Sequence, residues 1–224
     1  MDHTDQEYQA NLTQMRANIL QMAGLVEEMI SGAVRSLVER DPNKAADVIA
    51  MDARVNALEL DIDGLGVLIL ARWQPMASDL RFVTLAFKMV TDLERIGDLA
   101  VNISERAGDL SQAKESWRME EISAMAEIAR GMTHNAIDAF LDGDVERARN
   151  VIDRDDDVDR LYEEAFGSIL EIMIADPDRV HIGVHALSVA KWIERIADHA
   201  TNLAEQVIFM IEGKDIRHGG ELVS

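Results

Sequence analysis

The chain contains no cysteine among its 224 residues. Disulfide bonds, thiolate metal sites and cysteine nucleophiles are therefore excluded. Proline is also scarce, with three residues, and aromatic residues make up only 4% of the chain. Strands favour β-branched and aromatic side chains, and prolines interrupt helices. This composition therefore favours long helices over strands.

Basic residues are also few compared with acidic ones. Lysine and arginine number 22 against 42 aspartates and glutamates, which gives a net charge of −20. Nucleic acids and anionic membrane surfaces both require a basic face on the protein that binds them. We therefore expect no nucleic-acid partner, and the many carboxylates are available to cations instead.

Long apolar runs are missing as well. The longest run, residues 65–71, is far shorter than the roughly 20 residues that a membrane span needs. The first ten residues are acidic and polar and lack the features of a signal peptide. We expect a cytoplasmic protein without direct membrane insertion.

What the chain does contain is a high share of hydrophobic residues, 48%, recurring with a helical period. Pro42, Pro75 and Pro177 mark three of the breaks between segments, and either Ser78 or Asp79 is expected to cap the third helix. The predicted helices span residues 4–39, 44–73, 78–110, 117–141, 145–175 and 178–212, with a polar linker over residues 108–116.

An internal repeat relates the two halves. Residues 94–105 recur as residues 194–205 with seven identities in twelve positions, whereas residues 85–93 and 185–193 share only one alanine. Residues 48–58 are related to residues 151–161 in the same way. The sequence therefore predicts an all-α protein made of two tandem three-helix bundles, residues 1–112 and 113–224. Helices of about 30 residues are about 45 Å long, so both bundles should be elongated.

The repeated segment is predicted to carry an oxygen-rich stripe. At about 100° per residue, Glu94, Asp98 and Asn102 fall within roughly 80° of one another on the helix, opposite its apolar side. Carboxylates four residues apart repel each other, and a bound cation removes that repulsion. All-oxygen ligands suit Mg, Ca and Mn, and also iron.

The preceding helix of each half offers further oxygens, from Asp52 and Asn56 in one and from Asp155 and Asp159 in the other. The predicted ligands are Glu94, Asp98, Glu194, Asp198, Asp155, Asp159 and Asp52, with Asn56, Asn102, Asn202, Arg95 and Arg195 in supporting positions. The alternative interpretation is that these stripes are only the solvated faces of amphipathic helices.

The sequence motifs give little support for an enzymatic activity. A carboxylate-bridged di-metal oxidase would require Glu-x-x-His on two helices, but the residues three after Glu94 and Glu194 are Gly97 and Ala197. The sequence contains no glycine-rich phosphate-binding loop. It also contains no serine or threonine nucleophile with a general base at the position that a known motif requires. We therefore expect neither catalysis nor an organic cofactor.

One histidine pair has a spacing that could hold a metal. His181 and His185 stand four residues apart near the start of the sixth predicted helix. The first half has Arg81 and Leu85 at the corresponding positions, and no glutamate follows His181 as in zinc proteases. We interpret the two histidines as surface or packing residues.

Two segments resemble a known family. RWQPMASDLR (residues 72–81) followed by DLERIGDLAVNI (residues 92–103) resembles the signature of the PhoU phosphate-signalling proteins. IERIADHATN (residues 193–202) resembles its repeat, and the resemblance covers nearly the whole chain. It implies two three-helix bundles in a homodimer that binds multinuclear iron or zinc through Glu/Asp-x-x-x-Asp pairs.

The resemblance also implies a role without catalysis. Such proteins are negative regulators that restrain a phosphate sensor histidine kinase and contact the ATPase of the phosphate ABC transporter. By position, the ligand pairs are Glu94/Asp98, Glu194/Asp198 and Asp155/Asp159. Asp52 is followed by Asn56 instead of an acid, so a weaker or different site is expected in the first half. The alternative function is an accessory subunit of another phosphate or polyphosphate system.

Overall fold

The computed structural model describes residues 3–111 and 120–213, in which helices and short turns occur without any strand. The first bundle consists of α1 (His3–Glu39), α2 (Pro42–Trp73) and α3 (Ala77–Ser111). The second consists of α4 (Glu120–Asp142), α5 (Val145–Asp153), α6 (Asp155–Ala175), the 3-10 helix η1 (Pro177–Arg179) and α7 (Val180–Glu212). The predicted all-α pair of three-helix bundles is confirmed.

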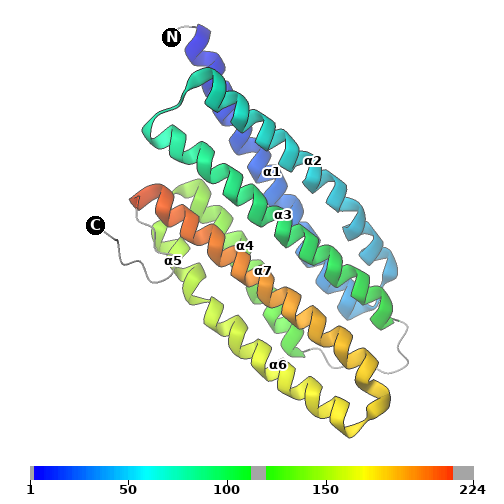
Figure 1. The fold of residues 1–224 in the computed structure, drawn as a ribbon. Helices are drawn as coiled ribbons and strands as arrows, with labels where there is room; N and C mark the ends of the chain where they lie inside the picture. The colour runs from blue at the N-terminus through cyan, green and yellow to red at the C-terminus, as the bar shows by residue number, and fades with distance from the viewer. Residues whose placement is uncertain (1–2, 112–119, 214–224) are drawn as a thin grey trace.

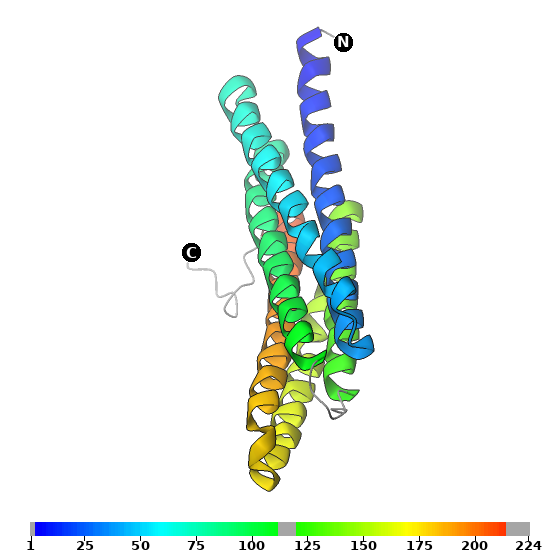
Figure 2. The same ribbon diagram turned by 90° about the vertical axis from the view of Figure 1, so that its right-hand side faces the viewer.

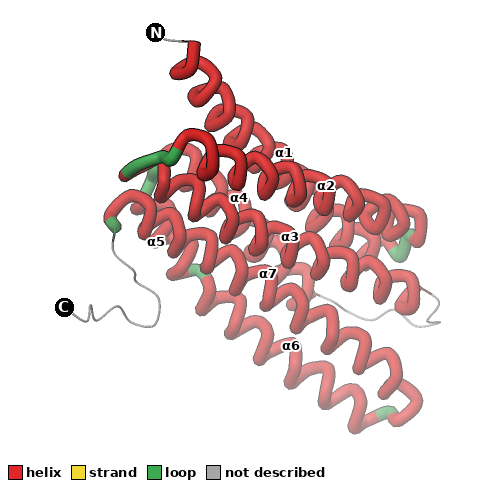
Figure 3. The backbone as a smooth tube through the Cα atoms, turned by 45° about the horizontal axis from the view of Figure 1, so that its top comes forward, coloured by secondary structure: helices red, strands yellow, loops and turns green. Residues whose placement is uncertain are grey.

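The two bundles lie side by side along their long axes. Helix α3 packs against α7, and α1 packs against α4, so these four helices form the centre of the molecule (Figures 1 and 3). Helix α2 lies outside α3, and α6 lies outside α7 (Figure 1). The α2–α3 turn and the start of α1 lie at one end, while the α6–α7 turn forms the opposite end (Figure 2).

A single continuous hydrophobic core runs through both halves. Its fully buried side chains include Met15, Met22 and Met29 on α1, Leu93 and Ile96 on α3, and Ile193 and Ile196 on α7. Burying a side chain of this size contributes about 1.5–3 kcal/mol. These three methionines thus fill part of the core. None of the described helices combines the length and the apolar character that a membrane crossing requires.

The predicted break between α1 and α2 is confirmed. The Asp41 side chain accepts a hydrogen bond from the backbone N–H of Asn43, and Pro42 occupies the first position of α2. Proline suits this position because its fixed φ is helical and its missing N–H would have no partner there. The helix therefore begins two residues before the predicted Lys44.

The predicted cap of α3 is wrong. The helix begins at Ala77, so Ser78 and Asp79 both lie inside its first turn. The carboxylate of Asp79 instead accepts a hydrogen bond of 2.7 Å from the Tyr8 hydroxyl group. This bond connects the start of α3 to α1.

The predicted helix over residues 145–175 has the observed ends, but it is interrupted at Arg154 and divided into α5 and α6. The N–H of Arg154 donates to the Val151 carbonyl at 3.2 Å, and the N–H of Asp157 donates to the Arg154 carbonyl at 3.2 Å. These bonds span three residues, so the α-helical pattern changes locally to the tighter 3-10 pattern. The acidic run 155–157 then forms the first turn of α6, where the helix dipole favours negative charge.

The junction between the halves is only partly described. Helix α3 continues through Gly108 to Ser111, past the point where the linker was predicted to begin. The predicted start of the fourth helix at Trp117 and the proposed domain boundary at residues 112–113 lie outside the described residues.

Gly97 gives a test of the packing between α2 and α3. A Cβ atom added there would lie 3.6 Å from Val55 Cγ1 and 3.7 Å from Met29 Cε, which are ordinary contacts. Because alanine is favoured over glycine inside helices, we expect Gly97→Ala to raise the free energy of unfolding by about 0.5–1 kcal/mol. Urea denaturation measures this change.

Gly66→Ala is the matched control. Its Cβ would lie 2.5 Å from Phe87 Cζ, so the ring must move at an overpacking cost of about 1–3 kcal/mol. We expect this cost to outweigh the helix propensity and to destabilise the protein by about 1 kcal/mol. Equal stabilisation by both substitutions would contradict the packing described.

Candidate cation sites

The predicted ligands of the second half come together between α6 and α7. These helices run antiparallel from η1, so the start of α6 lies beside the middle of α7 (Figure 1). Burial, followed by the charges of Asp198, Asp159 and Glu194, raises the pKa of Asp155 to about 6. The four carboxylates therefore share one region, which we call the α6–α7 acidic cluster.

Glu194 is largely buried in this cluster, with 13% of its side chain exposed. Its Oε1 accepts a hydrogen bond of 2.6 Å from Lys191 Nζ, whereas its buried Oε2 has no hydrogen-bond partner. Leaving a buried polar atom unpaired costs free energy that a ligand can recover. The orphaned oxygen is therefore compatible with cation coordination.

Asp198 experiences the same crowding, although part of it remains exposed. Burial of its carboxyl group and the charge of Glu194 raise its pKa, while Lys191 acts in the opposite direction. Negative charge thus exceeds positive charge within the cluster. A hard cation would relieve this imbalance because its charge favours the ionised form of each carboxylate.

Sequence reasoning missed Lys191. Its hydrogen bond to Glu194 raises the pKa of Lys191, and its Nζ also lies 5.3 Å from the centre of the Tyr162 ring. The only sequence signal was its position three residues before Glu194, where helical side chains meet. Lys191 acts as a tethered cation that partly neutralises the cluster.

The first-half ligands gather in the same way between α2 and α3. Burial raises the pKa of Glu94, and the charges of Asp98, Glu59 and Asp52 add to this effect while Arg95 opposes it. We call Asp52, Glu59, Glu94 and Asp98 the α2–α3 acidic cluster. Both predicted groups of acids are therefore brought close together.

The first cluster already has polar partners from the chain itself. Asn56 Nδ2 donates a hydrogen bond of 2.8 Å to the Asp52 carboxylate. Arg95 lies 3.4 Å from Glu94 and 3.3 Å from Asp98. An added cation would have to compete with Arg95 for both carboxylates.

Neither cluster forms a finished coordination sphere. Across the described residues, no three histidine, aspartate or glutamate side chains converge closely enough to hold a metal ion. At the α6–α7 cluster, Oε1 of Glu194 is held by Lys191, and Oε2 is left for ligation. The donor chemistry there fits a hard cation.

The other residues predicted to support the clusters differ in their burial and contacts. Asn102 is half-buried, whereas Arg195 and Asn202 are exposed. The side-chain amide of Asn202 donates to Asp92 on α3 at 3.4 Å, outside the acidic cluster. His199 also has its Nδ1 2.9 Å from Asp92. Asn202 therefore belongs to the contact between the halves.

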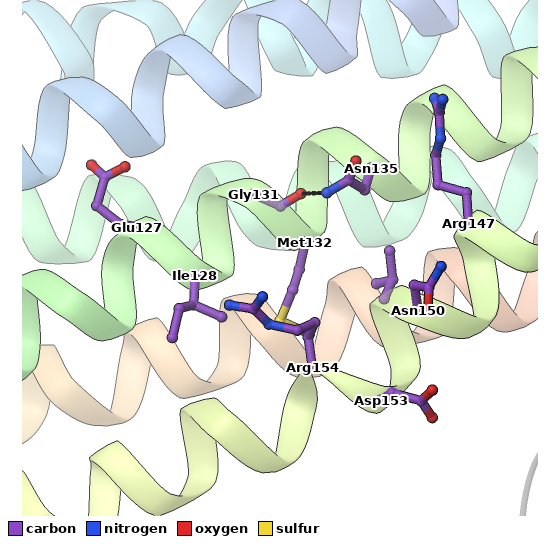
Figure 4. A pocket seen from close by; sticks show the side chains of 10 residues that line it. Glu127, Ile128, Gly131, Met132, Asn135, Arg147, Asn150, Asp153 and Arg154 are labelled. Carbon is purple, nitrogen blue, oxygen red and sulfur yellow. Dashed lines mark hydrogen bonds between the residues drawn. The ribbon is translucent and has the colours of Figure 1, made fainter.

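A separate hollow of about 640 Å³ lies between α4 and α5 (Figure 4). Two arginines line it, but Arg147 pairs with Asp138 at 2.9 Å and Arg154 pairs with Asp157 at 3.1 Å. The positive charge in this hollow is therefore already balanced by neighbouring carboxylates.

Comparison with known proteins matches these features to one family. The sequence profile described as "PhoU domain" matches residues 19–107 and again residues 122–207, one segment in each half. The chain belongs to the PhoU domain family. The "phosphate-specific transport system accessory protein PhoU homolog" of Pseudomonas putida is 39% identical over 219 residues, 97% of this chain and 86% of that protein. The protein of the same description from Caulobacter vibrioides (strain NA1000 / CB15N) is 35% identical over 216 residues, 96% and 94% of the two chains.

Solved PhoU structures share the fold. The crystal structure of PhoU from Pseudomonas aeruginosa superposes with a TM-score of 0.89 at 38% identity, covering 92% of this chain and 99% of that one. The phosphate transport system regulatory protein PhoU from Streptococcus pneumoniae gives a TM-score of 0.84 at 25% identity, covering 93% and 98%. The PhoU fold thus accounts for nearly all of the chain.

The two PhoU repeats differ at their acidic clusters. Asp159 of the second repeat corresponds to Asn56 of the first, and Lys191 corresponds to Thr91. The first repeat is thus neutralised by Arg95 and the second by Lys191. Each cluster holds four carboxylates, and the second also contains a buried oxygen without a hydrogen-bond partner, Oε2 of Glu194.

The raised pKa of Asp155 predicts how stability depends on pH. Because this pKa of about 6 lies above the ordinary value of 3.8, the folded state holds a proton that the unfolded state has lost. The free energy of unfolding of the metal-free protein should therefore fall as the pH rises from about 4 to about 6. Asp155→Asn removes this penalty, and we expect it to stabilise the metal-free protein at pH 7 by on the order of 1 kcal/mol after allowance for solvent screening.

Denaturation at pH 5 and pH 7 measures the effect. Asp52→Asn changes the corresponding residue of the first repeat, whose carboxylate is satisfied by Asn56, and should bring no such gain. A destabilised Asp155→Asn protein at pH 7 would show that the cluster is not strained by its charge.

Proposed function

We propose that this chain is an accessory protein of a phosphate transport system and regulates phosphate uptake without catalysing a reaction. The observation that carries the proposal is the near full-length similarity, over 97% of the chain, to a relative named for that role. The elongated double bundle supports it, since long helical sides offer extended surfaces for partner proteins.

The more detailed part of the proposal names the partner proteins and the sign of the regulation. The chain acts in the cytoplasm as a homodimer and negative regulator, linking the ATPase of a phosphate ABC transporter to a sensor histidine kinase. Its net charge of −20 favours basic surfaces on both partners.

We further propose that the α6–α7 acidic cluster is the main metal site. Asp155, Asp159, Glu194 and Asp198 would bind a multinuclear iron or zinc centre, with Mg, Mn and Ca as alternatives of the same oxygen chemistry. The α2–α3 cluster would bind more weakly, because Asn56 replaces one acid and Arg95 contacts two of the others.

Deleting the gene tests the regulatory role. We expect a phosphate-starvation reporter to become active in phosphate-rich medium, because the kinase would lose its restraint, and the wild-type gene to restore repression. Unchanged repression after deletion would refute the proposal. Strains that lack the transporter genes or the kinase gene serve as controls for the reporter.

Titration with Mn²⁺ or Fe²⁺ tests the metal assignment. We expect Glu194→Gln/Asp198→Asn to weaken binding by about tenfold or more, because two charged ligands become neutral. The matched pair Glu94→Gln/Asp98→Asn should weaken binding less. Calorimetry gives the affinities. Equal binding by the wild type and both variants would show that the clusters are only solvated helix surfaces.

A further inference from the structure

The start of α7 brings two imidazole rings together outside both acidic clusters. His181 Nε2 and His185 Nε2 lie 3.4 Å apart, with ring centres separated by 4.5 Å and planes at 81°. Both ring nitrogens thus converge on the same point beside the helix. His181 is exposed and His185 is half-buried, so a small ion can reach this point from solvent.

The nitrogen separation matches the geometry of a shared metal ion. Zinc–nitrogen bonds of about 2.0–2.1 Å at a tetrahedral angle place two ligand nitrogens roughly 3.3–3.4 Å apart. A direct hydrogen bond between the rings is the competing use of the two nitrogens. At 3.4 Å such a bond is long, because hydrogen bonds donated by N–H groups usually span about 2.7–3.2 Å, and an ion that binds both nitrogens would replace it.

The surroundings favour neutral imidazole, which is the form that binds metal. Burial and the neighbouring His181 lower the pKa of His185, with the carboxylate of Asp109 and the guanidinium of Arg106 acting in opposite directions. Arg106 and Asp109, on the last turns of α3, pair with each other at 2.8 Å. Their charges therefore largely cancel at the histidine pair.

We propose that His181 and His185 form a two-imidazole site for a borderline divalent transition ion such as Zn²⁺, Ni²⁺ or Cu²⁺. Imidazole suits these ions, whereas the carboxylate clusters suit harder ones. No third histidine or carboxylate of the described chain joins the pair in a group of three, so water completes the coordination sphere. The first repeat has Arg81 and Leu85 at these positions, and the site therefore belongs to the second repeat alone.

The position of the site has a structural consequence. Val180 begins α7 directly after η1, at the end of the molecule formed by the α6–α7 turn (Figure 2). An ion held by residues four apart connects the first two turns of the helix. Because such an ion binds the folded helix better than the unfolded chain, it stabilises this end of the protein.

Ni²⁺ binding to the full chain tests the proposal. We expect His181→Gln/His185→Gln to weaken Ni²⁺ affinity by about tenfold or more in equilibrium dialysis. His134→Gln removes another half-exposed helical histidine and serves as the matched control, which should bind as the wild type does. Glu194→Gln/Asp198→Asn should also retain Ni²⁺, which separates this site from the acidic cluster.

The Cu²⁺ form adds a spectroscopic test that folding differences cannot imitate. We expect its electron paramagnetic resonance to show coupling to two imidazole nitrogens in the wild type and in His134→Gln. Each single variant, His181→Gln and His185→Gln, should reduce this coupling. Unchanged Ni²⁺ affinity in the double histidine variant, or equal loss in Glu194→Gln/Asp198→Asn, would overturn the proposal.

Discussion

Helices α3 and α7 must each bury apolar side chains against their own bundle and against each other. Leu93 and Ile96 on α3 and Ile193 and Ile196 on α7 are almost fully inaccessible to solvent. Polar residues are confined to the rest of each helix surface, part of which is open to solvent, as at Lys88 and Arg95. Another part faces α2 in the first half and α6 in the second, where the acidic clusters lie. This constraint places carboxylates in a partly buried seam.

The seam explains why like charges gather and why each repeat partly neutralises them. Carboxylates held close together at a partly buried position have raised pKa values because burial and mutual repulsion both disfavour ionisation. One repeat offsets this with Arg95 and the other with Lys191. The two repeats therefore partly neutralise their carboxylates with different basic residues.

The sequence could predict the helices and the acidic clusters because both depend on local spacing. Ligand pairs four residues apart share a helix face, and short turns bring neighbouring helices into antiparallel contact. The break at Arg154 was missed because no glycine or proline marks it, and an acidic run is equally compatible with a continuous helix surface. The role of Lys191 was missed because a lysine near a glutamate on a helix usually points to solvent.

Contacts between the halves could not be predicted from the repeat, because they depend on how the bundles pack. At this interface Gln206 on α7 donates to Asp92 on α3 at 2.6 Å. The residues at the corresponding positions of the opposite repeats are Arg106 and Trp192, and the Arg106 guanidinium lies 6.0 Å from the centre of the Trp192 ring. The same pair of positions is therefore in contact on both sides of the molecule, once as a hydrogen bond and once as a cation–π contact. The geometry of the α3–α7 interface is common to both repeats, while its chemistry has diverged. His199 adds a further polar contact to Asp92, whereas the corresponding residue of the first repeat, Leu99, has an apolar side chain, so the two sides of the interface differ in polarity.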